Sequence, residues 1–434
     1  MILLILGFIA LGIAVVKILK FLDQTENNPL PIDKDKMIAA YVSILNRFAH
    51  SINRVARFVN AVRSVTPYKK VLCPHCFQSS IIKDLLYQCP DCNKTYSAFN
   101  AWLSPILPYR PPMCHDRSCV LCCPKCKKSL PVSLLESDNL PFSIIGVTSS
   151  GKTNLITISL EELDRLKDFE LEPADDATRH RQKMNWDKIC NEHRLPDSTP
   201  SGRKDPQIWI LRYLRQRKNG RIPVRTFTIY DGAGEDHETR LFTHDDTICR
   251  YITVSESIIL TLDPLILSEV RRQIDPSLAK YSGDSGIKNP CEVVQGLAQY
   301  IKDLKGLQVS QVLSIPVAVV LTKFDLITST KSFPSNALIR NNRGPLKDGG
   351  SDSSISFDDE ESLNVHKEIY DWLCNVGEER FINTLEANFD DYRLFGVSSF
   401  GAAPDASGKL PNRINPHRIL DPFFWIFHKK GFID

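Results

Sequence analysis

A glycine-rich stretch with a lysine and a threonine is the part of the sequence whose residue types point most directly to chemistry. Residues 146–153 read GVTSSGKT and follow the apolar segment 141–145 (PFSII). This is the GxxxxGK[ST] pattern between a strand and a helix, in which backbone N–H groups wrap phosphate oxygens. Lys152 is expected to reach the β- and γ-phosphates and Thr153 to ligate Mg²⁺. The predicted contacts are Gly146, Ser149, Ser150, Gly151, Lys152, Thr153 and Asn154.

An acidic residue also ends a later alternating segment. Residues 224–230 (VRTFTIY) lead into Asp231, and Gly234 lies three positions further on. In a phosphate site that contains Mg²⁺, a carboxylate at such a strand end holds the ion through water. We therefore expect Asp231 to contact Mg²⁺ and the Gly234 N–H to sense the γ-phosphate.

A third motif separates guanine from adenine. Residues 315–321 (IPVAVVL) have the continuous apolar character of a buried parallel strand and end in Thr322, Lys323, Phe324 and Asp325. A carboxylate at Asp325 accepts hydrogen bonds from N1–H and the 2-amino group of guanine, and adenine has neither donor. The stem of Lys323 is expected to cover the base. Ser398 and Ser399 follow another apolar segment and suit a loop that donates N–H groups to guanine O6, so the set predicts GTP.

Cysteines form a second chemical feature. Nine of the thirteen lie between Cys73 and Cys126, which favours a local metal module in a reducing compartment over a disulfide framework. Two CPxC turns predict one tetrahedral zinc site. Its expected ligands are Cys73, Cys76, Cys89 and Cys92.

A second zinc is expected from the cysteines that follow this pair of turns. The preferred ligands are Cys119, Cys122, Cys123 and Cys126. The alternative pairs Cys114 with Cys119 and keeps His115 in reserve. This zinc ribbon lacks a long basic and aromatic stripe, so contact with protein or a spacer role is favoured over nucleic-acid binding.

The elements that must position these residues indicate an α/β fold. Segments 207–214 and 221–230 flank Lys218-Asn219-Gly220, a hairpin signal. We therefore expect a mostly parallel sheet with one antiparallel edge strand. Segment 268–309 is expected to be an insertion that offers a partner surface. Segment 328–362, with its acidic run, is expected to be a disordered loop. Residues 420–427 (LDPFFWIF) are expected to form a closing helix on the sheet.

Residues 146–153, 231–234, 322–325 and 398–399 together resemble the Ras-like P-loop GTPases of the translation-factor-related (TRAFAC) class, and most of all the bacterial double-GTPase proteins. The resemblance covers residues 138–434. It implies GTP and Mg²⁺ as ligands, and work beside a second GTPase in bacterial signalling or defence. Segment 195–200 (LPDSTP) is similar to the first switch, so Thr199 is expected to sense Mg²⁺ and the γ-phosphate; an ordinary turn is the other interpretation.

One position departs from the Ras-like pattern. Where those enzymes place a glutamine after the DxxG glycine, this chain has Glu235. A negative charge beside the γ-phosphate is unfavourable without a cation, so slow hydrolysis is predicted, with a partner's arginine as an accelerator. The expected catalytic residues are Lys152, Thr199 and Glu235. A hypothesis of another class is a non-hydrolysing scaffold, in which nucleotide stabilises the fold and the zinc ribbon binds protein or nucleic acid.

Composition places these parts in a chain of 434 residues with a net charge of +3, too small for a protein that binds nucleic acid along its whole length. Residues 1–16 carry no charge, and Lys17 and Lys20 follow, which predicts a single-pass membrane anchor over 1–22 with the rest cytoplasmic. A cleaved signal peptide is the rival interpretation, and a buried core helix is the third.

Residues 23–70 contain a linker and a helix whose segment 37–70 has six basic residues and no acidic one. Packing on its own domain, self-association as a coiled coil and contact with anionic lipid are the three interpretations of this helix. The zinc ribbon is expected over 71–130, and the nucleotide-binding domain over 138–434.

Overall fold

The computed structural model describes most of the chain after residue 66. The described ranges are 67–103, 110–115, 117–137, 139–197, 206–214, 222–231, 251–273, 289–342, 344–347, 356–405 and 407–433. The expected anchor and nearly all of the expected basic helix lie outside them. Within these ranges, no helix combines the length and the apolar character that crossing a membrane requires.

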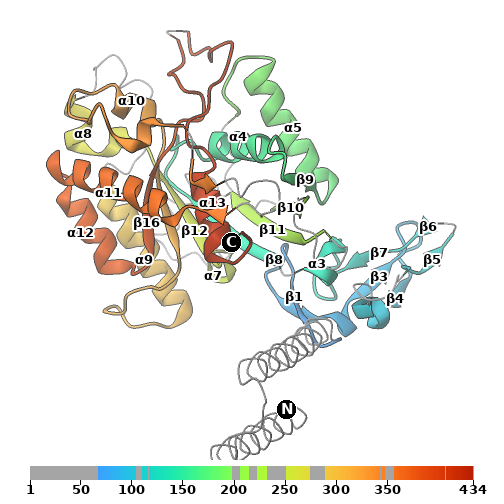
Figure 1. The fold of residues 1–434 in the computed structure, drawn as a ribbon. Helices are drawn as coiled ribbons and strands as arrows, with labels where there is room; N and C mark the ends of the chain where they lie inside the picture. The colour runs from blue at the N-terminus through green and yellow to red at the C-terminus, as the bar shows by residue number, and fades with distance from the viewer. Residues whose placement is uncertain are drawn as a thin grey trace, which may run out of the picture. The chain divides into compact units, whose positions relative to one another are not determined.

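A seven-stranded sheet dominates residues 139–433 (Figure 1). Across the sheet the strands are β16 (Tyr392–Gly396), β13 (Val317–Leu321), β12 (Ser257–Leu262), β8 (Asn139–Ile145), β11 (Val224–Asp231), β10 (Gln207–Tyr213) and β9 (Phe169–Pro173). The first five run parallel to one another. The α/β class with a mostly parallel sheet is therefore confirmed.

The antiparallel strand is not at the edge of the sheet, which corrects the sequence-based expectation. β10 is antiparallel to β11 on one side and to β9 on the other. β9 alternates buried Phe169 and Leu171 with exposed Glu170 and Glu172. Arg212 of β10 forms ion pairs with both glutamates, at 3.6 and 2.7 Å. These cross-strand contacts add β9 beyond the predicted hairpin.

Both faces of the sheet are covered by helices, because the central strands are apolar on both sides. Along β13, Val317, Val319 and Leu321 belong to one core, and Ala318 and Val320 belong to the other. Helices α9 (Pro290–Lys305), α11 (Asp359–Asn375) and α12 (Glu379–Asn388) bury side chains in the first core and appear together in Figure 1. Helices α4 (Lys152–Asp164) and α13 (Asp421–Lys429) bury side chains in the second core.

The helices of this part of the chain follow the strands in regular order. Their bounds are α4 (Lys152–Asp164), α5 (Asp176–Cys190), α7 (Tyr251–Val254), α8 (Ser268–Gln273), α9 (Pro290–Lys305), α10 (Phe324–Thr328), α11 (Asp359–Asn375), α12 (Glu379–Asn388) and α13 (Asp421–Lys429). Short elements between them are the 3-10 helices η3 (Pro264–Ile266) and η5 (Leu338–Arg340) and the hairpin strands β14 (Leu346–Lys347) and β15 (Ser356–Phe357). As expected, α13 packs its aromatic residues against the sheet.

Helix α9 lies in the stretch that we expected to be an insertion, but it is a core helix. The Asn289 side chain accepts a hydrogen bond from the N–H of Cys291, and Gly306 ends the helix with a φ of 64°. Ten of its residues are buried. It links β12 to β13 and fills the face between them, so it belongs to the domain itself.

The acidic run 358–361 was expected to lie in a disordered loop, and this expectation is corrected. Asp358 accepts a hydrogen bond from the N–H of Glu361 and caps α11. Acidic residues at a helix N-terminus are stabilised by the helix dipole, so the same charges that suggest disorder begin a helix here. Upstream, Phe333 and Ile339 are buried in the core.

A module of short strands precedes the sheet. Its elements are β1 (Lys70–Leu72), β2 (Ser79–Ile81), η1 (Ile82–Asp84), β3 (Leu86–Gln88), β4 (Thr95–Ser97), η2 (Phe99–Leu103), β5 (Met113–Cys114), β6 (Arg117–Ser118), β7 (Val120–Cys122) and α3 (Ser133–Glu136). β3 pairs with both β4 and β7, and β1–β2 and β5–β6 are separate hairpins. Its small core consists largely of cysteines and aliphatic side chains.

Candidate functional site

The glycine-rich loop joins β8 to α4 at the carboxyl edge of the sheet. Ser149 and Gly151 have φ angles of 61° and 84°, the left-handed backbone that reverses the chain before the helix. No side chain caps α4, whose helical residues begin at Lys152. The buried Lys152 amine donates to the carbonyls of Gly146 and Val147 at 2.7 and 3.0 Å. The loop thus gathers a helix N-terminus and a cation in one place, as anion binding requires.

Neighbouring strand ends hold this loop tightly. A Cβ on Gly146 would lie 2.2 Å from Thr261 Oγ1 and 2.5 Å from Thr261 O, so only glycine fits there. Ser150 Oγ lies 2.8 Å from Thr261 Oγ1. Thr322 Oγ1 lies within hydrogen-bond distance of Ser150 O, at 2.9 Å. The first motif is therefore bonded directly to β12 and to the start of the third motif.

The Mg²⁺ candidates approach the same edge. Asp231 is the last residue of β11 and pairs in register with Ile144 of β8, two residues before the loop begins. Its side chain is largely buried. Thr153 and Asn154 lie half-buried in the first turn of α4. Three residues expected to surround the γ-phosphate lie outside the described ranges: Thr199, Gly234 and Glu235.

The guanine-binding candidates lie where β13 ends. Lys323 has a φ of 51° and its amine contacts the Asp263 carboxylate at 2.5 Å. Asp263 follows β12 and is buried. Asp325 lies in the first turn of α10. Burial lowers the pKa of the nearby His417 below its usual value, and the negative charge of Asp325 acts in the opposite direction. Asp325 and His417 therefore lie in one electrostatic neighbourhood.

The loop after β16 packs against this motif. A Cβ on Gly396 would lie 2.5 Å from the Phe324 ring, and Phe324 N donates to Val397 O at 3.0 Å. Ser398 pairs with His417 through two backbone hydrogen bonds, and its hydroxyl accepts from Gly401 N at 2.9 Å. Ser399 is half-buried beside it. The loop thus has a defined conformation next to Asp325.

Sequence reasoning missed Asp263 as a partner of the site. Its signal is visible in retrospect, because an acid ends the apolar strand 257–262 just as Asp231 and Asp325 follow theirs. Asp263 also accepts a hydrogen bond from Leu265 N at 3.0 Å and so begins η3. It is held by the backbone before it pairs with Lys323.

The cysteines gather into two groups, and their partners differ from those expected. One group is Cys73, Cys76, Cys123 and Cys126, whose sulfur atoms lie within 4.8 Å of one another. The other contains Cys89, Cys92 and Cys114. The turns 73–76 and 89–92 therefore do not share a site, and Cys122, whose thiol lies 3.4 Å from Val120 O, belongs to neither group.

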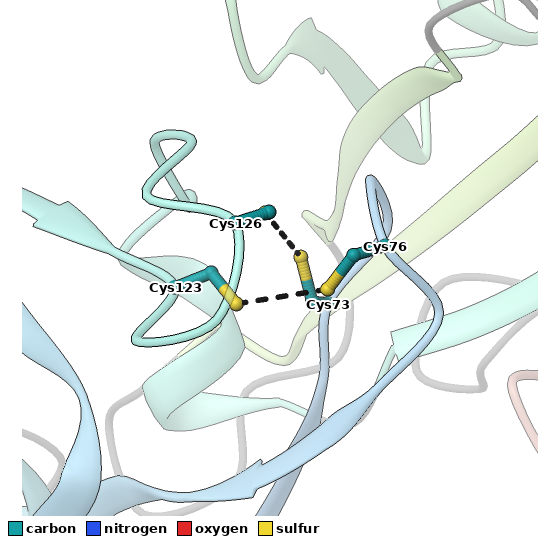
Figure 2. A group of neighbouring side chains, drawn as sticks. All are labelled: Cys73, Cys76, Cys123 and Cys126. Carbon is teal, nitrogen blue, oxygen red and sulfur yellow. Dashed lines mark hydrogen bonds between the residues drawn. The ribbon is translucent and has the colours of Figure 1, made fainter.

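Figure 2 shows the first group at two facing turns, one after β1 and one after β7. Cys73 Sγ lies 3.7 Å from Cys126 Sγ, and Cys76 Sγ lies 3.8 Å from Cys123 Sγ. Tetrahedral zinc with Zn–S bonds of about 2.3 Å places its sulfurs about 3.8 Å apart. Burial raises the pKa of the Cys73 thiol, so a bound cation is needed to stabilise its thiolate.

In the second group Cys92 Sγ lies 3.7 Å from Cys114 Sγ. Cys114 thus lies with Cys89 and Cys92, and not with Cys123 and Cys126 as the alternative that paired Cys114 with Cys119 requires. Cys119 is buried in the small core that also contains Cys89, and burial raises the pKa of its thiol. None of the twelve cysteines that the structure describes forms a disulfide. Both groups therefore have the residue types and spacing that could hold zinc.

Comparison with known proteins gives one curated relative. No protein-family model matches the chain. This chain is 22% identical over 329 residues to SaeC, a proposed ESX-1 scaffolding and assembly protein of Mycolicibacterium smegmatis. The match covers 70% of this chain and 78% of that protein.

Similar solved structures include several GTP-binding proteins. The small GTPase Arl6 (BBS3) of Trypanosoma brucei, bound to GppNp, has a TM-score of 0.25 at 10% identity and covers 68% of this chain and 99% of its own. The complex of signal recognition particle receptor SRb-GTP with SRX from Chaetomium thermophilum has a TM-score of 0.26 at 17% identity, with 62% and 94% covered. Such TM-scores do not establish a shared fold. A nucleotide site is therefore inferred from the strands and loops of this chain alone.

Proposed function

We propose that this protein is a GTP-binding switch. The observation that carries the proposal is the convergence of four separate segments at one edge of the sheet: the 146–153 loop, Asp231, the 322–325 segment and the 398–399 loop. Each lies at the carboxyl end of a parallel strand, and ligands of open α/β sheets bind outside the carboxyl ends of such strands. The hydrogen bonds of Ser150 to Thr261 and Thr322 support a single, pre-arranged site.

Guanine is the base that best fits this site. Asp325 can accept two hydrogen bonds from guanine, and the Lys323 stem, held by Asp263, can cover the ring. The strand order supports a Ras-like P-loop GTPase domain, extended by β9 beyond the antiparallel β10. Mg²⁺ would be held by Thr153 and Asp231, and would neutralise charge on the β- and γ-phosphates.

Titration of the full chain with fluorescent GTP and ATP, with and without Mg²⁺, tests this proposal. We expect clear preference for GTP and tighter binding with Mg²⁺. Lys152→Ala should abolish most of the binding, because it removes the cation of the phosphate loop. Equal affinity of the wild-type protein for the two nucleotides would refute the guanine assignment.

The zinc ribbon belongs to the same proposal, with a nested arrangement of ligands. The outer turns supply one zinc site, with Cys73, Cys76, Cys123 and Cys126. The inner cysteines supply another, with Cys89, Cys92, Cys114 and Cys119. Metal analysis should give two zinc ions per chain. Cys122→Ser should keep both, whereas Cys123→Ser should lose one; loss of zinc on changing Cys122 would contradict this ligand set.

A scaffold is the second candidate function. It is favoured by the similarity to SaeC, whose name describes scaffolding and assembly. Here nucleotide would stabilise the fold, and the zinc ribbon would bind protein or nucleic acid. Single-turnover GTP hydrolysis separates the two: slow hydrolysis through Thr199 and Glu235, accelerated by a partner such as a second GTPase, fits the switch, and no turnover with any partner fits the scaffold.

The location of the protein is part of the proposal. Residues 1–22 would anchor it to a membrane as a single-pass helix, with the remaining chain in the cytoplasm and the basic segment 37–70 close to the lipid surface. Separation of membranes under alkaline carbonate tests this. The full chain should stay with the membrane pellet, and a chain that lacks residues 1–22 should not.

A further inference from the structure

The turn 73–76, one of the two outer turns of the zinc ribbon, contacts β11, the strand that ends in the proposed Mg²⁺ ligand Asp231. Pro74, which lies between Cys73 and Cys76, accepts a hydrogen bond from the Tyr230 hydroxyl at 3.1 Å. Phe77, which follows Cys76, meets the Tyr230 ring edge-on at a centroid distance of 5.4 Å. Tyr230 is 3% exposed and directly precedes Asp231. The turn therefore contacts both the hydroxyl group and the aromatic ring of Tyr230.

A third aromatic residue joins this contact. The Tyr251 ring, at the first residue of α7, stacks on Tyr230 at 5.2 Å with an interplanar angle of 17°. Phe77 lies 6.5 Å from Tyr251. The three rings thus join the zinc turn to the last residue before Asp231 and to the start of the next described helix. Tyr230 and Tyr251 are both buried in the core that α9 covers.

Phe77 is not explained by the turn itself. The three CPxC turns share one backbone pattern, in which the residue after the second cysteine has a positive φ: 62° at Phe77, 58° at Asn93 and 60° at Lys127. Each donates its N–H to the carbonyl of the first cysteine of its turn, at 3.0–3.1 Å. A bulky aromatic residue is disfavoured at positive φ. Asn93 and Lys127 are exposed, so among the three turns only 73–76 places there an aromatic residue that packs against the core.

We propose that the zinc-loaded turn 73–76 positions Asp231 through Phe77 and Tyr230, and that Mg²⁺-dependent nucleotide affinity depends on this contact. Asp231 pairs with Ile144 in the β11–β8 ladder and directly follows Tyr230, so the position of Tyr230 affects the position of Asp231. Zinc fixes Cys73 and Cys76, and with them Pro74 and Phe77. Phe77 and Tyr230 are positioning residues, since neither is a proposed ligand of Mg²⁺. The inference rests on the proposed GTP site.

The test compares GDP affinity with saturating Mg²⁺ and in Mg²⁺-free buffer without chelator, so that zinc is retained. The full chain and the variants Phe77→Ala, Tyr230→Phe and Asn93→Ala are used. In Phe77→Ala we expect the gain in affinity from Mg²⁺ to fall by about fivefold or more, with Mg²⁺-free affinity and zinc content unchanged. Tyr230→Phe, which loses only the hydroxyl contact, should fall by about twofold to fivefold. Asn93→Ala is the matched control and should behave as wild type.

A merely structural role would lower affinity equally in both buffers. An unchanged gain from Mg²⁺ in both Phe77→Ala and Tyr230→Phe would overturn the inference while leaving GTP binding intact. If Phe77→Ala loses its zinc or its fold, Tyr230→Phe decides. Wild-type protein that binds no guanine nucleotide in either buffer would refute the proposed function and the inference together.

Discussion

Asp263 holds the side chain of Lys323, which is proposed to cover the base. The Asp263 side chain is 3% exposed, accepts a hydrogen bond from Leu265 N, and contacts the Lys323 amine at 2.5 Å. Lysine has a flexible stem, and a charge-assisted hydrogen bond to a fixed carboxylate limits its rotamers. The pair therefore prepares Lys323 to cover the base before nucleotide arrives.

Asp263→Asn is expected to weaken GTP binding by about threefold to tenfold, equivalent to roughly 1 kcal/mol. Asparagine keeps an oxygen for Leu265 N, so η3 and the fold should be retained. Asp391→Asn is the matched control, because Asp391 pairs with Lys429 at 2.9 Å at the opposite end of β16. Calorimetric titration with GTP measures both. Equal affinity in Asp263→Asn and wild type would mean that the ion pair does not position Lys323.

The motifs predicted where the candidate nucleotide-binding residues lie in the fold better than they predicted which cysteines lie together. The phosphate loop, Asp231 and the 322–325 segment lie at the strand ends where their motifs indicated, because each motif is a local turn with a local preference. A CPxC turn is also local, and all three turns form. Which turns share an ion depends on how β3, β4 and β7 pair, and the sequence spacing of Cys73, Cys76, Cys89 and Cys92 carries no information on that pairing.

At the scale of elements, α11 is joined to β16 by a histidine. His366 Nδ1 accepts a hydrogen bond from Leu394 N at 3.0 Å, so the ring must be unprotonated at this nitrogen. Burial, followed by the charges of Arg393 and Lys367, lowers the pKa of His366 from 6.5 to about 4. Protonation of His366 at Nδ1 would therefore break the hydrogen bond that joins α11 to β16.

This coupling predicts an acid-sensitive stability. A pKa that is lower in the folded state contributes stability above pH 6.5, and that stability is lost as the pH falls from about 6.5 toward about 4. His366→Asn keeps an acceptor for Leu394 N but cannot titrate. Urea unfolding across this window should show wild type losing about 1–3 kcal/mol more than the variant, a range reduced for partial solvent screening. Parallel pH profiles would contradict the role of His366.

The elements missed by sequence analysis share a physical cause. Strand β9 has only two buried apolar residues, and α5 buries only Thr178, Gln182 and Ile189, so neither has a clear apolar period. The cap of α5, where Asp175 accepts from Thr178 N at 2.7 Å, is the signal that could have located it. For α9 and the start of α11, length and charge suggested peripheral segments, whereas capping and burial make them part of the domain.

At the scale of the whole molecule, the module of short strands contacts the sheet beside the proposed guanine-nucleotide site. The sheet brings four motifs to one edge, and the module's outer turn contacts Tyr230 beside one of them. Bound zinc would supply part of the stability of such a small module, because its core is small and contains four buried cysteines. Zinc binding and nucleotide binding are therefore both expected to affect β11, the first through Tyr230 and the second through Asp231.

The proposed guanine-nucleotide site is tested most directly by the base preference of Asp325→Asn. Guanine offers two donors to Asp325, N1–H and the 2-amino group, whereas xanthine has a carbonyl in place of the amino group and suits an asparagine amide. We predict that wild type binds GTP in preference to XTP and ATP. The variant should lose about 100-fold in GTP affinity and prefer XTP. An unchanged preference for GTP in Asp325→Asn would contradict the account.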